Sequence, residues 1–148
     1  MEEARWLVEH GYPTKDEQQR LKALTLSQVK AEADAGSPSA KVVYASKLSL
    51  EPGKFHSGAL LLHDQAVAGN LYAYYGLSEA YWNSNDNRNL VDSAAYLRVA
   101  YLLGDSRAGD QIGTLKLSQA ELAVADQRAA SLLNTFAGGL QTSRRPLE

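Results

Sequence analysis

The sequence predicts an all-α protein in which pairs of helices stack into a solenoid, and three glycines carry most of that prediction. Gly36, Gly69 and Gly104 are 33 and 35 residues apart, which is the period of a two-helix repeat. An alanine follows each glycine after four residues, and largely apolar side chains precede it by three and by seven. Steps of three and four keep side chains on one face of a helix, so the pattern indicates a buried stripe on both sides of each glycine.

Each of these glycines is followed by a residue that can begin a helix, namely Ser37, Asn70 or Asp105. Glycine accepts the left-handed backbone that ends a helix. The side-chain oxygen of the next residue can then accept a hydrogen bond from a free N–H group of the new helix. The pattern therefore predicts tight corners between helices. The expected helices cover residues 3–10, 15–23, 26–35, 38–49, 55–68, 71–83, 89–103, 106–117 and 119–137.

The residues around Gly69 resemble a Sel1-like repeat, a family of TPR-like helical repeats. In that family an Ala-Ala-x-x-Gly segment ends one helix, and the next helix carries Ala, a Leu-Gly pair and Tyr at fixed steps after the glycine. The matching positions are Ala73, Leu77, Ser78 and Tyr81, with the equivalents Ala40, Tyr44, Ala45 and Leu48, and Ala108, Ile112, Gly113 and Lys116. The repeats are degenerate, because Leu61-Leu62 and Tyr96-Leu97 replace the Trp-Tyr pair of the family.

The resemblance implies a right-handed α-α solenoid and an adaptor or scaffold role, often in bacterial signalling, secretion or envelope assembly. We expect one domain over residues 1–140, with capping helices at 1–24, repeats at 25–117 and a C-terminal helix at 118–138. Residues 141–148 are expected to form a mobile tail. The final Leu147-Glu148 resembles an expression-vector scar.

Composition excludes several classes of protein. The chain has 148 residues and a net charge of −2, without the basic footprint of a nucleic-acid binder. It contains no cysteine, which excludes disulfides, thiolate metal sites and a cysteine nucleophile. No apolar run is long enough to span a bilayer. The compartment stays open between cytoplasm and periplasm, because an excised fragment can lack its native signal peptide.

The sequence also lacks the patterns that carry catalysis. His10, His56 and His63 have no further histidine or carboxylate at metal-ligand spacing. Phosphate-binding, dinucleotide-binding and nucleophile-elbow motifs are missing. We therefore expect no enzyme activity, no metal and no cofactor.

Tyrosines crowd the helix that follows Gly69, and we expect some of them to line a concave groove. Successive residues of a helix point about 100° apart. One helix therefore cannot bury all three of Tyr72, Tyr74 and Tyr75. Groove exposure is favoured for Tyr74. For Tyr75, groove exposure and filling of a gap between repeats are equal alternatives. The predicted groove residues are Lys41, Tyr74, Tyr75, Arg107 and Asp110.

A groove of mixed charge with tyrosines suits a protein or peptide segment better than a polyanion. The leading hypothesis is therefore a module that binds a segment of a partner protein. Several alternatives stay open. One is a structural protein that self-associates, for example as a homodimer. Another is a non-catalytic regulatory domain of a larger envelope or secretion protein. An enzyme on a repeat scaffold is disfavoured by the missing catalytic constellation, and a weaker alternative is glycan binding through the tyrosines.

Overall fold

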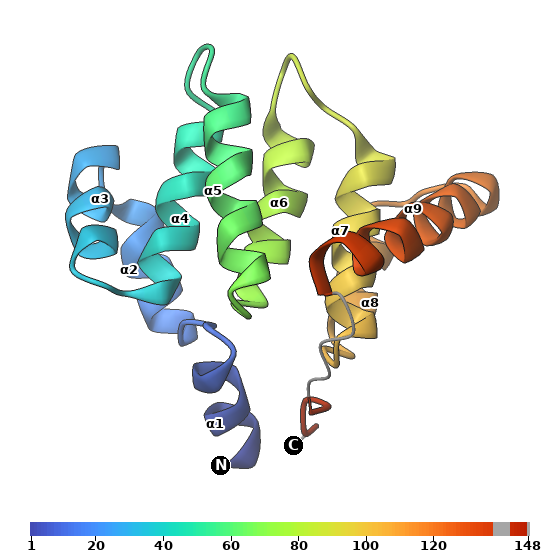
Figure 1. Cartoon of the computed structure of the whole chain (residues 1–148), viewed down its shortest axis with the longest axis horizontal. Helices are drawn as coiled ribbons and strands as arrows, with labels where there is room; N and C mark the ends of the chain where they lie inside the picture. Colours follow the sequence, from blue (N-terminus) through green and yellow to red (C-terminus); the bar gives the residue numbers. More distant parts are fainter. Residues whose placement is uncertain (138–142, 148) are drawn as a thin grey trace.

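The computed structural model describes residues 1–137 and 143–147, and every regular element among these residues is an α-helix (Figure 1). The all-α prediction is thus confirmed. The helices are α1 (Glu2–Glu9), α2 (Lys15–Ala23), α3 (Leu26–Asp34), α4 (Pro38–Ser49), α5 (Phe55–Val67), α6 (Tyr72–Asn83), α7 (Leu90–Leu102), α8 (Ala108–Thr114) and α9 (Gln119–Ala137). In the part of the chain that the structure describes, none of them is long and apolar enough to cross a membrane.

The three corner glycines have the left-handed backbone that the sequence predicted, with φ of +106°, +97° and +124° at Gly36, Gly69 and Gly104. Ser37 caps α4, because its hydroxyl accepts a hydrogen bond from the amide of Ala40 at 3.2 Å. The expectation that Asn70 caps α6 is wrong, since that helix begins after Leu71. The side-chain amide of Asn70 instead donates to the carbonyl oxygen of Pro38 at 3.1 Å, and so connects the corners at Gly36 and Gly69.

Helices α4 to α7 form the packed centre and approach one another over small residues. Each packs on the next, and α4 also lies beside α6. A methyl group at Gly58 would lie 2.6 Å from the carbonyl oxygen of Ala45 and 2.6 Å from the amide nitrogen of Ser49, so α5 can approach α4 this closely only with glycine there. The alanines of the predicted stripe, Ala40, Ala73 and Ala108, are fully buried.

The C-terminal third departs from this regular pairing. Helix α8 spans only Ala108–Thr114, less than the expected 106–117. Helix α9 packs across α7 and reaches α5 (Figure 1). Phe136 near its end is buried against Tyr74 and Tyr96, with ring centroids 6.0 and 6.1 Å apart. The last helix therefore covers the packed centre and does not extend the row of helices.

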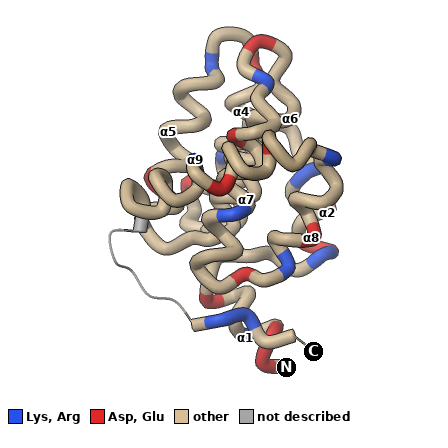
Figure 2. The backbone as a smooth tube through the Cα atoms, turned by 90° about the vertical axis from the view of Figure 1, so that its right-hand side faces the viewer, with Lys and Arg blue, Asp and Glu red and all other residues tan. Residues whose placement is uncertain are grey.

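The described C-terminal residues return to the N-terminal helix, and both ends of the chain lie together (Figure 1). Figure 2 shows the basic residues of this segment beside the acidic start of α1. The Trp6 indole N–H donates to the Ser143 carbonyl oxygen at 2.8 Å, and the Arg145 amide donates to the Gly104 carbonyl oxygen at 2.9 Å. Of the tail expected to be mobile, 143–147 is hydrogen-bonded to the domain, and residues 141, 142 and 148 lie outside the described residues.

Candidate functional site

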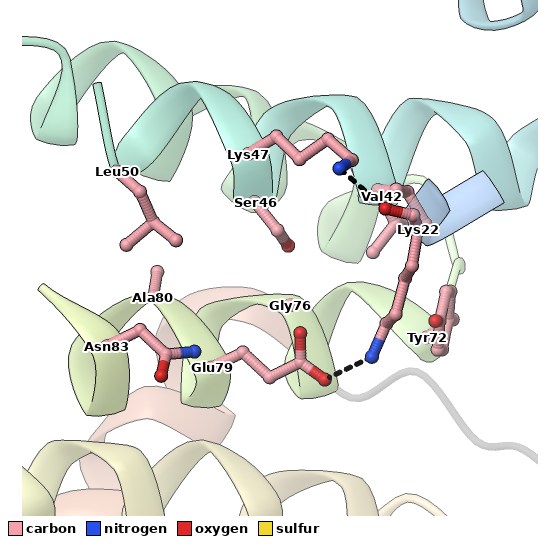
Figure 3. Close-up of a pocket in the computed structure, with 11 residues that line it drawn as sticks. Lys22, Val42, Ser46, Lys47, Leu50, Tyr72, Gly76, Glu79, Ala80 and Asn83 are labelled. Carbon is pink, nitrogen blue, oxygen red and sulfur yellow. Dashed lines mark hydrogen bonds and ion pairs between the residues drawn. The ribbon is translucent and has the colours of Figure 1, made fainter. Parts of the chain in front are cut away.

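Three adjoining cavities follow one face of α6. The first, about 290 Å³ in volume, lies between α2, α4 and α6 (Figure 3). Polar contacts close one side of it: the Lys22 ammonium lies 3.0 Å from a Glu79 carboxylate oxygen, and the Lys47 ammonium donates to the Lys22 carbonyl oxygen at 2.8 Å. It is lined by Lys22, Val42, Val43, Ser46, Lys47, Leu50, Tyr72, Gly76, Glu79, Ala80 and Asn83.

The second and third cavities continue along the same helix toward α8. The second, about 410 Å³, is bordered by the segment after α1, by α2 and by the C-terminal segment. The third, about 370 Å³, lies between α6, α7 and α8. Glu79 lines all three cavities, Tyr72 the first two and Tyr75 the last two. Because they share these walls, we treat them as one surface and call it the inner groove.

The inner groove uses a consistent helix face, counted from each corner glycine. Positions three, seven, ten and fourteen after the glycine recur in its walls, which is the spacing of one side of a helix. Tyr72 and Arg107 are at position three, and Val43, Gly76 and Gln111 are at position seven. Ser46, Glu79 and Thr114 are at position ten, and Leu50 and Asn83 are at position fourteen.

Tyr74 is not exposed in the groove, so that expectation is wrong. Its side chain is 1% exposed and packs against Phe136 of α9. The physical reason is the register: Tyr74 is two residues from both Tyr72 and Gly76, about 200° around the helix, and therefore points to the opposite side. Burial raises the pKa of its phenol to about 12.

The other four predicted groove residues divide into two pairs. Tyr75 and Arg107 do line the inner groove, and both lie in the wall of the second cavity. For Tyr75, the structure combines the two alternatives, because the ring is partly buried and still borders the groove. Lys41 and Asp110 are not among the residues that line the three cavities.

A fully buried carboxylate, Asp105, is hydrogen-bonded to four residues that line the second cavity. The hydroxyl groups of Tyr12 and Tyr75 each donate to its Oδ2 at 2.7 Å. Its Oδ1 accepts from the Arg145 guanidinium at 3.0 Å and from the Arg107 amide at 3.1 Å. Four donors thus satisfy the carboxylate, and Arg145 balances its charge.

Glu3 completes the site from α1. Its Oε1 accepts from Nε of Arg145 at 2.9 Å and lies 2.8 Å from Nη2 of the same side chain. It also accepts from Nε of Arg107 at 3.1 Å. We call Arg145 together with Glu3, Tyr12, Tyr75 and Asp105 the arginine clasp.

The protonation of the clasp follows from its burial. Burial and the negative charge of Asp105 raise the pKa of Tyr12 well above its ordinary value, and burial and the hydrogen bond to Asp105 do the same for Tyr75. Burial lowers the pKa of Arg145, but the hydrogen bonds to Asp105 and Glu3 and the negative charges of both carboxylates together outweigh it, and the net shift is upward. Both phenols therefore remain donors, and the guanidinium remains charged.

Sequence reasoning missed the clasp. Asp105 was singled out only as a residue that could begin a helix, and Tyr12 and Arg145 were not singled out at all. Glu3 and Arg145 are 142 positions apart, so no local spacing connects them. The one available signal is a carboxylate at a corner position where the other two corners have neutral Ser37 and Asn70.

Among residues 1–137 and 143–147, no three histidine or carboxylate side chains are grouped so that they could hold a metal ion. Comparison of the chain with protein-family models, with curated proteins and with solved structures gives no match. The resemblance to Sel1-like repeats therefore stays a prediction, which rests on the residues quoted for it.

Proposed function

We propose that this protein is an interaction module: a short right-handed α-solenoid of degenerate Sel1-like repeats that binds an extended segment of a partner protein in its inner groove. The observation that carries the proposal is the continuity of the three cavities along α6, which share Tyr72, Tyr75 and Glu79. A partner segment in this groove meets tyrosine rings, apolar walls and a few charged groups, the composition common at the centre of protein interfaces.

The charges of the groove suit a polypeptide. Lys22 and Glu79 face each other in the first cavity, and Lys15 and Arg107 border the second. Exposed pairs such as Lys22–Glu79 contribute little to stability, about 1 kcal/mol or less, so they can exchange partners at small cost. Such a groove offers both donors and acceptors to a peptide backbone and its side chains.

Selection from a random peptide library displayed on phage tests the proposal. We expect peptides to be enriched on the 148-residue chain and to bind Glu79→Ala at least about tenfold more weakly, since Glu79 borders all three cavities and a lost charged hydrogen bond costs about 1.5–3 kcal/mol. The matched control is Val67→Ala on α5, a 61% exposed residue outside these walls. Equal affinity of selected peptides for both variants would contradict the proposal.

A second candidate is self-association through the outer side of α5. Leu60 and Val67 are 62% and 61% exposed and are seven residues apart, so they share one face of the helix. Light scattering on the purified protein at high concentration separates the candidates. A monomer excludes self-association, whereas a dimer that Leu60→Asp dissociates supports it.

A further inference from the structure

The arginine clasp holds a segment of the chain in the way that a receptor holds a peptide. Ser143 and Arg144 are exposed and Leu147 is 64% exposed, whereas Arg145 and Pro146 are partly buried. Arg145 is only 13% exposed. The residue before a proline favours extended backbone, and Arg145 precedes Pro146. An anchored side chain flanked by main-chain hydrogen bonds, here accepted by the Ser143 carbonyl oxygen and donated by the Arg145 amide, is a typical arrangement for peptide recognition.

The pocket around the guanidinium is built without the C-terminal segment. The Tyr12 ring contacts those of Tyr72 and Tyr75, with centroids 5.6 Å apart in both cases. Three of the four hydrogen bonds to Asp105 come from Tyr12, Tyr75 and the Arg107 amide. These groups keep the carboxylate in place when Arg145 leaves.

The empty pocket would select for arginine. A buried carboxylate without a cation is strongly unfavourable, so Asp105 favours any cation that can reach it. Nε and Nη2 of Arg145 face Glu3, while Nη1 faces Asp105. A planar guanidinium can bridge two carboxylates in this way, whereas the ammonium of lysine is a single point charge.

The clasp opens into the inner groove. Tyr12, Tyr75, Arg107 and Arg145 all border the second cavity, whose walls continue to Tyr72 and Glu79. A segment whose arginine entered the clasp would therefore have its neighbouring residues in the groove. The chain's own segment competes for the same place at an effective concentration of about 1 mM.

From these contacts we propose that the clasp is the arginine-recognition pocket of the inner groove. The ligand is an extended segment of a protein partner that carries an arginine, and it binds by displacing the chain's own Arg145. This inference rests on the proposed function. It specifies the chemistry of the partner, and it gives an autoinhibitory role to residues 143–146, which precede the scar-like Leu147-Glu148.

Peptide binding to variants of the whole 148-residue chain tests this. The probe is fluorescein-labelled Ser-Arg-Arg-Pro-Leu, the sequence of residues 143–147, measured by fluorescence anisotropy. We expect Arg145→Ala, in which the competing side chain is gone, to bind it about tenfold more tightly than wild type. The matched control Arg144→Ala alters an exposed arginine one position away and should bind like wild type. A peptide with lysine for its second arginine should bind Arg145→Ala about tenfold more weakly.

A second measurement needs no variant. The Trp6 indole N–H is bonded to Ser143, so its NMR resonance reports whether the segment is seated. Millimolar unlabelled peptide added to wild type should shift this resonance. An unshifted Trp6 resonance, together with no binding to Arg145→Ala, would overturn the proposal, as would equal binding of the arginine and lysine peptides.

The outcomes separate this inference from the proposed function. If library peptides bind in a Glu79-dependent way but the arginine peptide does not bind Arg145→Ala, the clasp is only a structural contact and the groove still stands. If the arginine peptide binds Arg145→Ala and the additional change Glu79→Ala has no effect, the clasp acts alone and the groove proposal fails. Dimerisation of wild type that Arg145→Ala abolishes would assign the clasp to exchange of segments between copies, and would overturn a separate partner.

Discussion

The packed centre and the arginine clasp are stabilised in opposite ways. Between α4 and α7, small residues such as Gly58 and Ala73 let backbones approach closely, and buried rings such as Tyr74 fill the remaining space. In the clasp, Asp105 and Arg145 form an ion pair surrounded by hydrogen-bond donors. Apolar packing is non-directional and spread over many contacts, whereas a buried ion pair needs every partner in position. The centre is thus suited to a permanent scaffold, and the clasp to a contact that can be exchanged.

The residues after the three corner glycines also differ in whether they bond locally or across the fold. Ser37, Asn70 and Asp105 occupy the same position after a corner glycine, yet each has a different role. Ser37 caps its own helix, and Asn70 bonds to the neighbouring corner at Pro38. Asp105 holds residues from both ends of the chain. The same position after a corner glycine can therefore serve local structure at one corner and a long-range site at another.

The largest expected effect is on the packed centre. Tyr74→Ala should cost about 3–5 kcal/mol of unfolding free energy, because it empties a fully buried ring site beside Phe136. Trp82→Ala, at a 36% exposed aromatic in the wall of the third cavity, should cost about 1 kcal/mol or less. Chemical denaturation of both variants measures the difference. Similar losses for the two rings would mean that Tyr74 is not part of the centre.

Tyr74 also marks where prediction from the sequence stopped. The helices, the corners and the alanine stripe depend on local backbone preferences and on side-chain periodicity. Both can be recognised from residues that are close together in the sequence. Which side of α6 faces the groove depends on how α6 crosses α4 and where α9 packs. Phe136 of α9 packs on Tyr74, although the two are 62 residues apart in sequence, 136 − 74. The clasp is harder still to predict from the sequence, because Glu3, Asp105 and Arg145 meet only once the whole chain has folded.

An intermediate loss of unfolding free energy is expected for substitutions in the arginine clasp. Tyr12→Phe and Tyr75→Phe each remove one hydrogen bond to the Asp105 carboxylate and should cost about 1.5–3 kcal/mol, the range for hydrogen bonds to charged groups. Tyr101→Phe, at a 36% exposed tyrosine on α7, is the control and should change stability by about 0.5 kcal/mol or less. The chain has two tryptophans, so Tyr75→Phe is measured in a Trp82→Phe background, where the fluorescence reports Trp6. If the clasp opens independently of the centre, the fluorescence transition will precede the loss of helical circular dichroism. Coincident transitions would show that the two regions unfold as one unit.

The smallest expected effect is a loss of stability at acidic pH, and we expect it to arise in the packed centre. His63 on α5 is partly buried, with its ring 4.5 Å from that of Phe136 and its Nε2 3.4 Å from the Tyr96 hydroxyl. Burial lowers the pKa of His63 below its ordinary value, while nearby Asp64 opposes and Arg128 reinforces that shift. Because the unfolded chain then binds the proton more readily than the folded one, stability should fall as the pH drops below about 6.5, the ordinary pKa of histidine. His63→Gln removes this contribution, so its melting temperature should decrease less than that of wild type between about pH 7 and pH 5. Parallel decreases in the two proteins would place the acid sensitivity outside the α5–α9 contact, and would leave the clasp, with its two carboxylates and its guanidinium, as the region to test next.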